Sequence, residues 1–361
     1  MLRLLGADYH PVALVATLVL GSAGGAMAAF IGTPLPWLFG SVLAVGAVSI
    51  AGLKVRRAPL CFPPEVRGMF VPVIGVSIGG AFTPEMLSEA AVWGPSLLAL
   101  FLYVPMVHVA GYAWCRHVGG LAPATAWFGA MPGGFVEAIV MGEAFGAQIA
   151  VLAAMQFLRL IMCILLIPLG FSLIEGVAVG SAAGVSLPGA GQPLSAADAL
   201  VLVACGVSGY FAGRWMRLPA GVIAGPLLVS GVAHLAGLVD GHPPAWAVQV
   251  TQLVIGVSLG VRFAGVPRRD LVRALRLSAT LVAGTLALAA LMGFALGHLV
   301  GESVEAVILA FAPGGLVEMS LVALSLGVSA IYVTVHHVLR ILLAVTFGRL
   351  AWGYLSRRRG G

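Results

Sequence analysis

The stretch Met131–Arg159 reads MPGGFVEAIVMGEAFGAQIAVLAAMQFLR, and Ala312–Arg340 reads APGGLVEMSLVALSLGVSAIYVTVHHVLR. The two stretches align without a gap at an offset of 181 residues, from position 131 to position 312. Pro-Gly-Gly, a glutamate three residues after the second glycine, and a final arginine recur in both. Self-similarity at a fixed spacing is the signature of a duplicated structural unit. We therefore predict two copies of one module.

The repeat extends toward the N-terminus. Ile74–Phe82 matches Ile255–Phe263 at the same offset, and further upstream the offset becomes 185, which aligns Gly21, Gly24, Pro34 and Gly40 with Gly206, Gly209, Pro219 and Gly225. The first apolar segment, which resembles a signal peptide, has a counterpart in mid-chain and is interpreted as a retained helix. The predicted organisation is repeat 1 over residues 1–175, a Gly-, Ala-, Ser- and Pro-rich linker over 176–196, and repeat 2 over 197–361.

The composition indicates a membrane protein. Apolar residues make up 60% of the 361 positions and charged residues only 9%, whereas soluble domains carry about 25% charged residues. Runs of about 20 apolar residues cross a bilayer as helices, because backbone groups in lipid must bond within their own segment. We predict an all-α polytopic fold with five spans per copy: about 12–30, 36–53, 68–82, 91–114 and 149–173, then 197–213, 219–238, 246–263, 277–300 and 328–350.

The two segments that contain Pro-Gly-Gly, about 122–146 and 303–327, are named here the PGG segments. Proline and glycine interrupt a helix, so each PGG segment either crosses the membrane as a broken helix or returns as a re-entrant hairpin. If both return, the Lys and Arg of the loops lie on one side; if both cross, Arg214, Arg217, Arg268, Arg269, Arg273 and Arg276 move to the other. The positive-inside rule favours the hairpins. Each copy then crosses an odd number of times, which predicts inverted repeats in a bacterial inner membrane with both termini in the cytoplasm.

Ionisable side chains inside these apolar segments are the candidate functional residues, because a charge at the centre of a membrane helix costs about 2.5–3.5 kcal/mol. Each motif glutamate lies in the first turn of the half-helix after the break, where the helix dipole favours a carboxylate. The amide or imidazole three residues before each arginine shares its helix face. The predicted substrate- or ion-binding residues are Gly133, Gly134, Glu137, Gln156, Arg159, Gly314, Gly315, Glu318, His337 and Arg340.

Two interpretations of these charges stay open. Helix N-termini in broken helices attract anions, or hold carboxylates that bind cations. Alternatively, each glutamate neutralises an arginine and only fixes the hairpin in place. The sequence itself does not choose between a binding site and a structural ion pair.

Other chemistries find little support in the sequence. Cysteines show no paired spacing, and the adjacent His336 and His337 point about 100° apart on a helix, so we expect no metal and no cofactor. A Walker-type phosphate loop, a nucleophile elbow and a basic helix-turn-helix are missing. The expected partners are the lipid bilayer and a small solute or ion, with no nucleic acid; a homo-oligomer is compatible with the sequence.

The chain resembles the AbrB-type membrane protein family with its duplicated domain. The resemblance rests on the tandem PGG-x-x-E motif, the downstream Gln/His-x-x-Arg, PLPWLFG from Pro34 and LPAGVIAGPLL from Leu218, and it covers nearly the whole chain. It implies labels of two kinds, ammonia monooxygenase and membrane regulator of gene expression. The chain departs from the family at Gln148 and Ser329, where members often have an acidic residue. It also departs at Ala138, because the methionine that follows the motif glutamate in the family is kept only in the second copy, as Met319. The soluble DNA-binding regulator of the same name is not similar.

The leading hypothesis is a secondary transporter-like carrier of a small solute or ion. One alternative is a membrane regulator of gene expression, which acts through a partner because the sequence holds no soluble effector domain. The other is a monooxygenase, which needs a redox metal held by several His or carboxylate ligands. The histidine spacing does not favour such ligands, so an enzyme is the less favoured interpretation.

Overall fold

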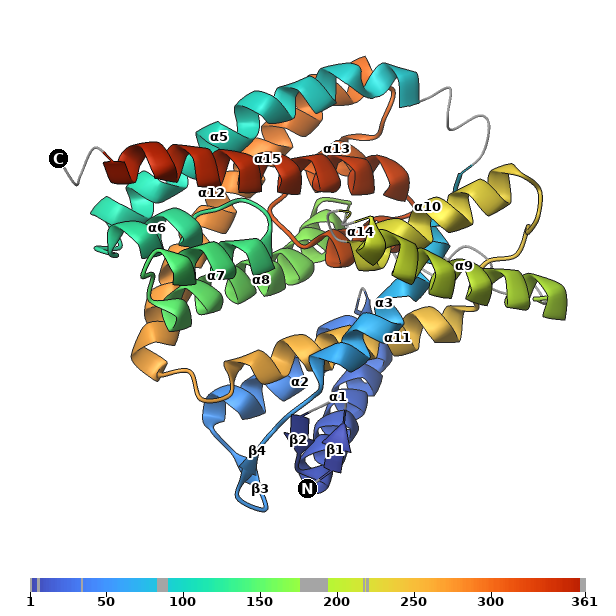
Figure 1. The fold of residues 1–361 in the computed structure, drawn as a ribbon, viewed down its shortest axis with the longest axis horizontal. Coiled ribbons are helices and arrows are strands. Elements are labelled where there is room, and N and C mark those ends of the chain that lie inside the picture. Colours follow the sequence, from blue (N-terminus) through green and yellow to red (C-terminus); the bar gives the residue numbers. More distant parts are fainter. Residues whose placement is uncertain are drawn as a thin grey trace. The chain divides into compact units, whose positions relative to one another are not determined.

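The computed structural model describes residues 2–4, 7–33, 35–82, 90–175, 194–216, 218 and 221–357. Most of the linker predicted over 176–196 lies outside these residues, as do Pro34, Arg217 and Pro219 from the repeat and topology assignments. The described chain is mostly helical (Figure 1). Two short antiparallel β-hairpins are added to the predicted helices: Leu2–Leu4 (β1) with Ala7–Tyr9 (β2), and Lys54–Val55 (β3) with Ala58–Pro59 (β4).

Each predicted span corresponds to a helix. In the first copy these are α1 (Pro11–Ile31), α2 (Pro36–Ala51), α3 (Pro64–Gly79), α5 (Gly94–His117) and α8 (Ile149–Glu175). In the second they are α9 (Ala196–Trp215), α10 (Gly221–Leu235), α11 (Ala245–Gly260), α12 (Arg268–Val300) and α15 (Ala330–Arg357). Single 3₁₀ turns, η1 (Ala90–Trp93) and η3 (Val261–Phe263), precede α5 and follow α11.

Seven of the described helices are long and apolar enough to cross a membrane, and α2 and α10 are shorter apolar helices. The chain is therefore an integral membrane protein of the polytopic, α-helical kind. The helix α3 does not belong to either group among the described residues, although a span was predicted over 68–82. Glu65 and Arg67 in its first turns lower its apolar character.

The PGG segments are the only parts of the two predicted copies that fold as pairs of short helices within the described residues. In the first copy α6 (Pro123–Gly129) and α7 (Phe135–Ala144) flank the break, and in the second α13 (Val304–Phe311) and α14 (Leu316–Leu326) do so. The helix α13 begins at Ser303, whose hydroxyl accepts the backbone N–H of Ala306. Such a cap satisfies one of the free N–H groups at a helix start.

The helices form two compact units, which are described separately. Unit 1 comprises residues 1–87, 164–265 and 320–331, and unit 2 comprises 88–163, 266–319 and 332–361. Each unit takes segments from both predicted repeats. Packing therefore follows a different division of the chain from the sequence repeat, whose boundaries stay a prediction.

In unit 1, glycines bring two helix pairs into close contact. A Cβ atom added to Gly24 of α1 would collide with the carbonyl oxygen of Gly40 of α2, and the reverse holds as well. A Cβ atom added to Gly225 of α10 would likewise collide with the carbonyl oxygen of Gly209 of α9, and one added to Gly209 would collide with the backbone of Gly225 and Pro226. These four glycines are the ones aligned at the offset of 185, so one helix-crossing geometry occurs in both copies. Small residues at such crossings allow the close backbone approach typical of membrane helices.

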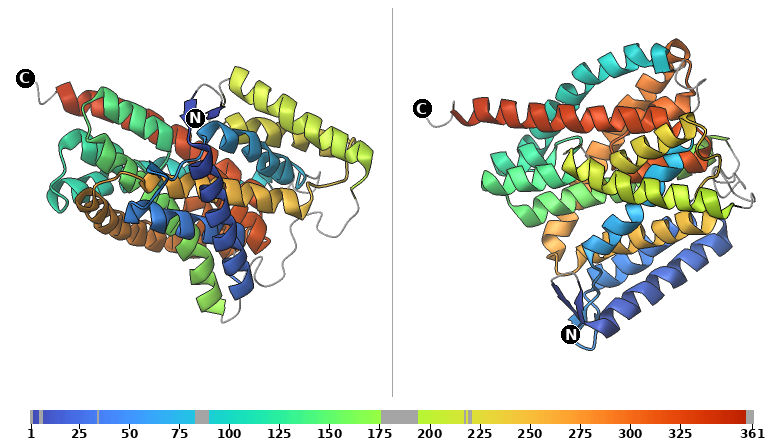
Figure 2. Two further views of the ribbon diagram at one scale, coloured as in Figure 1. Left: turned by 90° about the horizontal axis from the view of Figure 1, so that it is seen from below. Right: turned by 45° about the vertical axis from the view of Figure 1, so that its right-hand side comes forward.

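The third helix of each copy packs on the second helix of the other copy. A Cβ atom added to Gly75 of α3 would lie 2.5 Å from the carbonyl oxygen of Ile223 of α10. One added to Gly256 of α11 would lie 2.7 Å from the carbonyl oxygen of Leu38 of α2. Figure 2 shows the blue pair α1–α2 from two further directions, and α2 lies against α11. The two copies thus exchange helices within unit 1.

Candidate functional site

The first PGG segment is a helical hairpin in unit 2. The backbone N–H of Gln148, at the start of α8, donates to the hydroxyl of Thr125 in α6 at 2.9 Å. The rings of Phe128 and Phe145 stack with centroids 5.8 Å apart. Gly134 turns the chain with φ of +70°, a conformation that glycine adopts without steric cost. Thr125 near the start of the segment and Gln148 after its end therefore lie side by side. Whether the segment re-enters or crosses the membrane stays a prediction.

Two side chains of α8 bond the carbonyl groups at the end of α6. The Nε2 of Gln156 donates to the carbonyl oxygens of Phe128 at 2.9 Å and Gly129 at 3.2 Å. The guanidinium of Arg159 donates to the carbonyl oxygen of Met131. The last carbonyl groups of a helix have no partner within it and carry partial negative charge. Gln156 and Arg159 thus compensate the break in the helix.

The second copy repeats this arrangement. His337 bonds the carbonyl oxygen of Leu309 through Nε2 at 2.9 Å, and Arg340 donates to the carbonyl oxygens of Ala312 and Gly314. Arg340 also approaches Nδ1 of His337 at 3.1 Å. Because an arginine only donates, Nδ1 accepts and the proton lies on Nε2. In both copies the side chain at the Gln156/His337 position and the arginine three residues later each bond a carbonyl group that lies 28 residues earlier in the chain.

The motif glutamates fold back on the first turn of their own helices. Gly134 precedes α7, and Oε2 of Glu137 would lie 3.2 Å from a Cβ atom on that glycine. Oε2 of Glu318 lies against Gly315, which precedes α14, in the same way. A carboxylate at the third helical position commonly reaches back to the helix start. The copies differ in access, since Glu137 is exposed and Glu318 is only 2% exposed.

Each break lies on the long helix of the other copy. A Cβ atom added to Gly133 would be 3.4 Å from Cα of Ile341 in α15, and one added to Gly315 would be 3.2 Å from Cδ2 of Leu160 in α8. Leu160 and Ile341 are equivalent at the offset of 181. Within unit 2 both breaks thus contact α8 and α15. Of the ten predicted site residues only Glu137 is exposed.

Both motif arginines are buried, with exposed fractions of 7% for Arg159 and 1% for Arg340. In the described part of the chain their hydrogen bonds go to backbone carbonyls and His337, not to carboxylates. Their Nε atoms and Oε1 of Gln156 lack a hydrogen-bond partner there. The alternative that each glutamate neutralises an arginine is thus not the arrangement seen.

Further residues of the site were not predicted from the sequence. The hydroxyl of Tyr103 in α5 donates to the carbonyl oxygen of Phe311 at 2.9 Å, and the two rings meet edge to face. His336 bonds the hydroxyl of Ser96 at 2.8 Å, whereas the adjacent His337 faces α13. A polar aromatic residue inside an apolar run is the signal for Tyr103, but it has no counterpart in the other copy.

A redox-metal site does not fit the residues that the structure describes. Among them, no three His, Cys, Asp or Glu side chains come together as ligands. His108, on an apolar helix, is instead packed on Trp127 with ring centroids 4.2 Å apart and bonds its carbonyl oxygen at 3.0 Å. Nitrogen and sulfur ligands for copper or iron are thus not assembled in these parts of the chain.

Comparison with known proteins identifies the family of this chain. The family model described as "Transition state regulatory protein AbrB" matches residues 37–356. "Uncharacterized protein YhjN" of Bacillus subtilis (strain 168) is 24% identical over 352 residues, which are 91% of this chain and 89% of that protein. "Putative regulator AbrB" of Escherichia coli (strain K12) is 26% identical over 281 residues, 76% of this chain and 78% of that protein. The match over most of the chain shows that this integral membrane protein belongs to the AbrB family.

Proposed function

We propose that this protein is a secondary transporter-like carrier that binds a small anionic solute where the two PGG breaks meet. The observation that supports it is the pair of buried arginines, Arg159 and Arg340, which bond carbonyl groups and retain free Nε–H donors in the described structure. Neutral carbonyl partners do not cancel the positive charges. A bound anion supplies the missing counter-charge.

The free-energy cost of burying the two arginines favours a bound anion over a purely structural role for them. Each buried ion that lacks a counter-ion costs several kcal/mol even after relaxation. Hydrogen bonds from a charged donor return about 1.5–3 kcal/mol each, so the carbonyl contacts offset part of this cost. Arginine matches the planar oxygens of carboxylates and phosphates in particular. The preferred substrate class is therefore a small carboxylate or phosphate-like anion.

The helix ends add to this preference. Gly134 and Gly315 precede α7 and α14, so the N-terminal ends of both helices lie at the breaks. The partial positive charge at these ends favours anions. Glu137 and Glu318 lie at the same helix ends. Because Glu137 is exposed and Glu318 is buried, we assign these two carboxylates the control of solute access to this positive region.

The membrane arrangement of the proposal has two inverted repeats, each with a re-entrant PGG hairpin, and both termini in the cytoplasm. If both hairpins return, the basic residues of the loops lie on one side of the membrane, which the positive-inside rule favours. The exchanged helices of unit 1 and the reciprocal contacts of the breaks in unit 2 support a two-fold relation between the copies. Inverted repeats with discontinuous helices are the usual plan of alternating-access carriers.

A second candidate is a regulator of gene expression that acts through a partner protein. It is favoured by the name of the E. coli relative, "Putative regulator AbrB". A carrier that reports its occupancy to a partner would combine both functions. Affinity purification in mild detergent, followed by mass spectrometry, tests this candidate.

The carrier proposal is tested with purified protein in liposomes. We expect at least one labelled anion from the set acetate, succinate, phosphate and sulfate to enter by counterflow. Arg159→Gln with Arg340→Gln, reconstituted at a temperature at which circular dichroism shows the variant to be folded, should abolish that uptake. Arg269→Gln, the same change at an exposed position, should leave it intact. Uptake of only neutral or cationic solutes, or anion uptake insensitive to the double variant, contradicts the proposal.

A further inference from the structure

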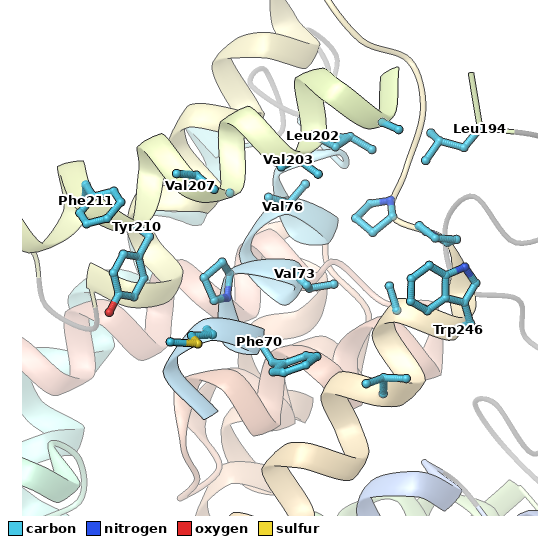
Figure 3. A pocket seen from close by; sticks show the side chains of 18 residues that line it. Phe70, Val73, Val76, Leu194, Leu202, Val203, Val207, Tyr210, Phe211 and Trp246 are labelled. Carbon is cyan, nitrogen blue, oxygen red and sulfur yellow. The ribbon is translucent and has the colours of Figure 1, made fainter. Parts of the chain in front are cut away.

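Unit 1 contains an apolar groove of about 790 Å³ that is separate from the PGG site in its residues. Its walls are α3, α9 and the start of α11 (Figure 3). Phe70, Val73 and Val76 line it from α3, and Leu202, Val203 and Val207 line it from α9. Trp246 lies at one end of the groove and Tyr210 at the other.

A second, polar pocket of about 450 Å³ adjoins the Tyr210 end. Met69 and Tyr210 line both spaces, so the two are neighbours. The polar pocket contains one carboxylate, Glu65, and one guanidinium, Arg214. Arg214 donates to the hydroxyl of Tyr210 at 2.8 Å and lies 5.4 Å above the centre of its ring. The groove is thus apolar along its length, and the pocket at its Tyr210 end carries one negative and one positive side chain.

We propose that this space binds one phosphatidylethanolamine molecule, with an acyl chain in the apolar groove and the head group in the polar pocket. Arg214 holds the phosphate, and Glu65 accepts hydrogen bonds from the primary ammonium. One positive and one negative side chain are the complement of a zwitterion, whereas an anionic head group would leave Glu65 facing a like charge. Charge-assisted hydrogen bonds of this kind are the strong ones.

The dimensions of the groove suit a single acyl chain. It follows α9 from Ala199 to Phe211, which is roughly 18 Å at 1.5 Å per helical residue. Half of a hydrocarbon core of about 30 Å is about 15 Å, so the groove is as long as one leaflet is deep.

The test uses a residue that lines the groove. A Cβ atom on Gly206 would lie 3.7 Å from Val76, an ordinary contact, so Gly206→Phe fits at its base and fills the groove with its ring. The matched control is Gly284→Phe on α12, where an added Cβ atom has no neighbour within 4 Å. The probes are phosphatidylethanolamine, phosphatidylcholine and phosphatidylglycerol of identical acyl composition, titrated onto delipidated full-length protein and followed by native mass spectrometry.

We expect the unaltered protein and Gly284→Phe to retain one phosphatidylethanolamine, and Gly206→Phe to lose it. Glu65→Gln should weaken phosphatidylethanolamine binding about tenfold, which corresponds to about 1.4 kcal/mol, and should remove the preference over phosphatidylcholine. Arg214→Gln should weaken binding of all three lipids.

Equal lipid binding by Gly206→Phe and Gly284→Phe overturns the proposal, and so does tighter binding of phosphatidylglycerol that Glu65→Gln leaves unchanged. A dimer that Gly206→Phe dissociates would assign the groove to a second copy instead and would also overturn it. Circular dichroism of each variant separates loss of lipid from loss of fold. The result is independent of the proposed carrier function, because the groove shares no residue with the PGG site.

Discussion

Arg340 donates a hydrogen bond to the carbonyl oxygen of Ala312, the residue immediately before the second Pro-Gly-Gly. Arg159 makes the same bond to Met131 before the first. In each copy a cation thus meets the negative end of the short helix before the break, where the helix dipole favours positive charge. The broken helix is held from the side by the next long helix, and this relation can be tested directly.

Arg340→Gln should destabilise the protein strongly. The change removes donors from the carbonyl oxygens of Ala312 and Gly314 and leaves buried polar groups unsatisfied, which costs about 1–3 kcal/mol for each group. Thermal unfolding in detergent should show a markedly lower Tm, and Arg340→Lys should recover part of the loss. Arg269→Gln at an exposed position should change stability by no more than about 0.5 kcal/mol. Equal Tm values for Arg340→Gln and Arg269→Gln would refute the bracing role.

Gly134→Ala should be more harmful than Gly146→Ala. Both glycines have φ near +70°, so both changes carry a similar backbone cost of roughly 1–2 kcal/mol. Only at Gly134 does the new methyl group also meet a neighbour, Val345 at 2.8 Å, since Gly146 has nothing within 4 Å. Chemical or thermal unfolding of the two variants measures the difference. A Gly146→Ala variant as unstable as Gly134→Ala would show that the packing contact does not matter.

Reporter tags fused after residue 120 and after residue 147 should lie on the same side of the membrane. Thr125 and Gln148 are joined by a hydrogen bond of 2.9 Å, so the chain on either side of the first hairpin starts and ends at one level. Paired alkaline phosphatase and green fluorescent protein fusions read out the side at each position. Opposite sides for the two tags would mean that the segment crosses the membrane.

The protein should lose stability in mild acid through His242, which lies between α10 and α11. Burial, and then the neighbouring His234, hold the pKa of His242 below its usual 6.5. The rings stack with centroids 5.7 Å apart. Because the unfolded chain binds a proton more readily, this stability is complete above pH 6.5 and falls as the pH drops below it.

His242→Asn should flatten that part of the stability curve. The measurement is Tm against pH between 5 and 7.5 for both proteins in the same detergent. His10→Asn serves as the control for a histidine elsewhere on the chain. Parallel curves for the unaltered protein and His242→Asn would assign the acid sensitivity to other groups.

Long apolar runs made the spans predictable, because a helix is the only way to satisfy the backbone of a single segment in lipid. The duplicated motif also led to the residues around the breaks, since the same hydrogen bonds recur at the offset of 181. The sequence did not reveal that carbonyl groups, and not glutamates, are the partners of Arg159 and Arg340. Helical spacing tells which face a side chain occupies, but the opposing group comes from tertiary packing.

Three other features were not predictable from the sequence. Tyr103 reaches Phe311 across 208 positions of the chain, and no local pattern encodes such a distance. The two packing units mix segments of both copies. This could not be predicted, because the apolar face of a helix indicates that the face is buried but not which helix packs on it. The short β-hairpin at Lys54–Pro59 lies between the predicted spans 36–53 and 68–82, where no strand was predicted.

The exchange of helices in unit 1 sets an order on biosynthesis. Gly75 of α3 lacks a side chain and so leaves room for the backbone of Ile223 of α10. Nearly 150 residues must be translated between the two. At about 5–20 residues per second, α3 waits roughly 7–30 seconds in the membrane before its partner emerges from the ribosome. During that interval its glycine-bearing face is open to other nascent chains, so the insertion machinery must shelter the first half until the second arrives.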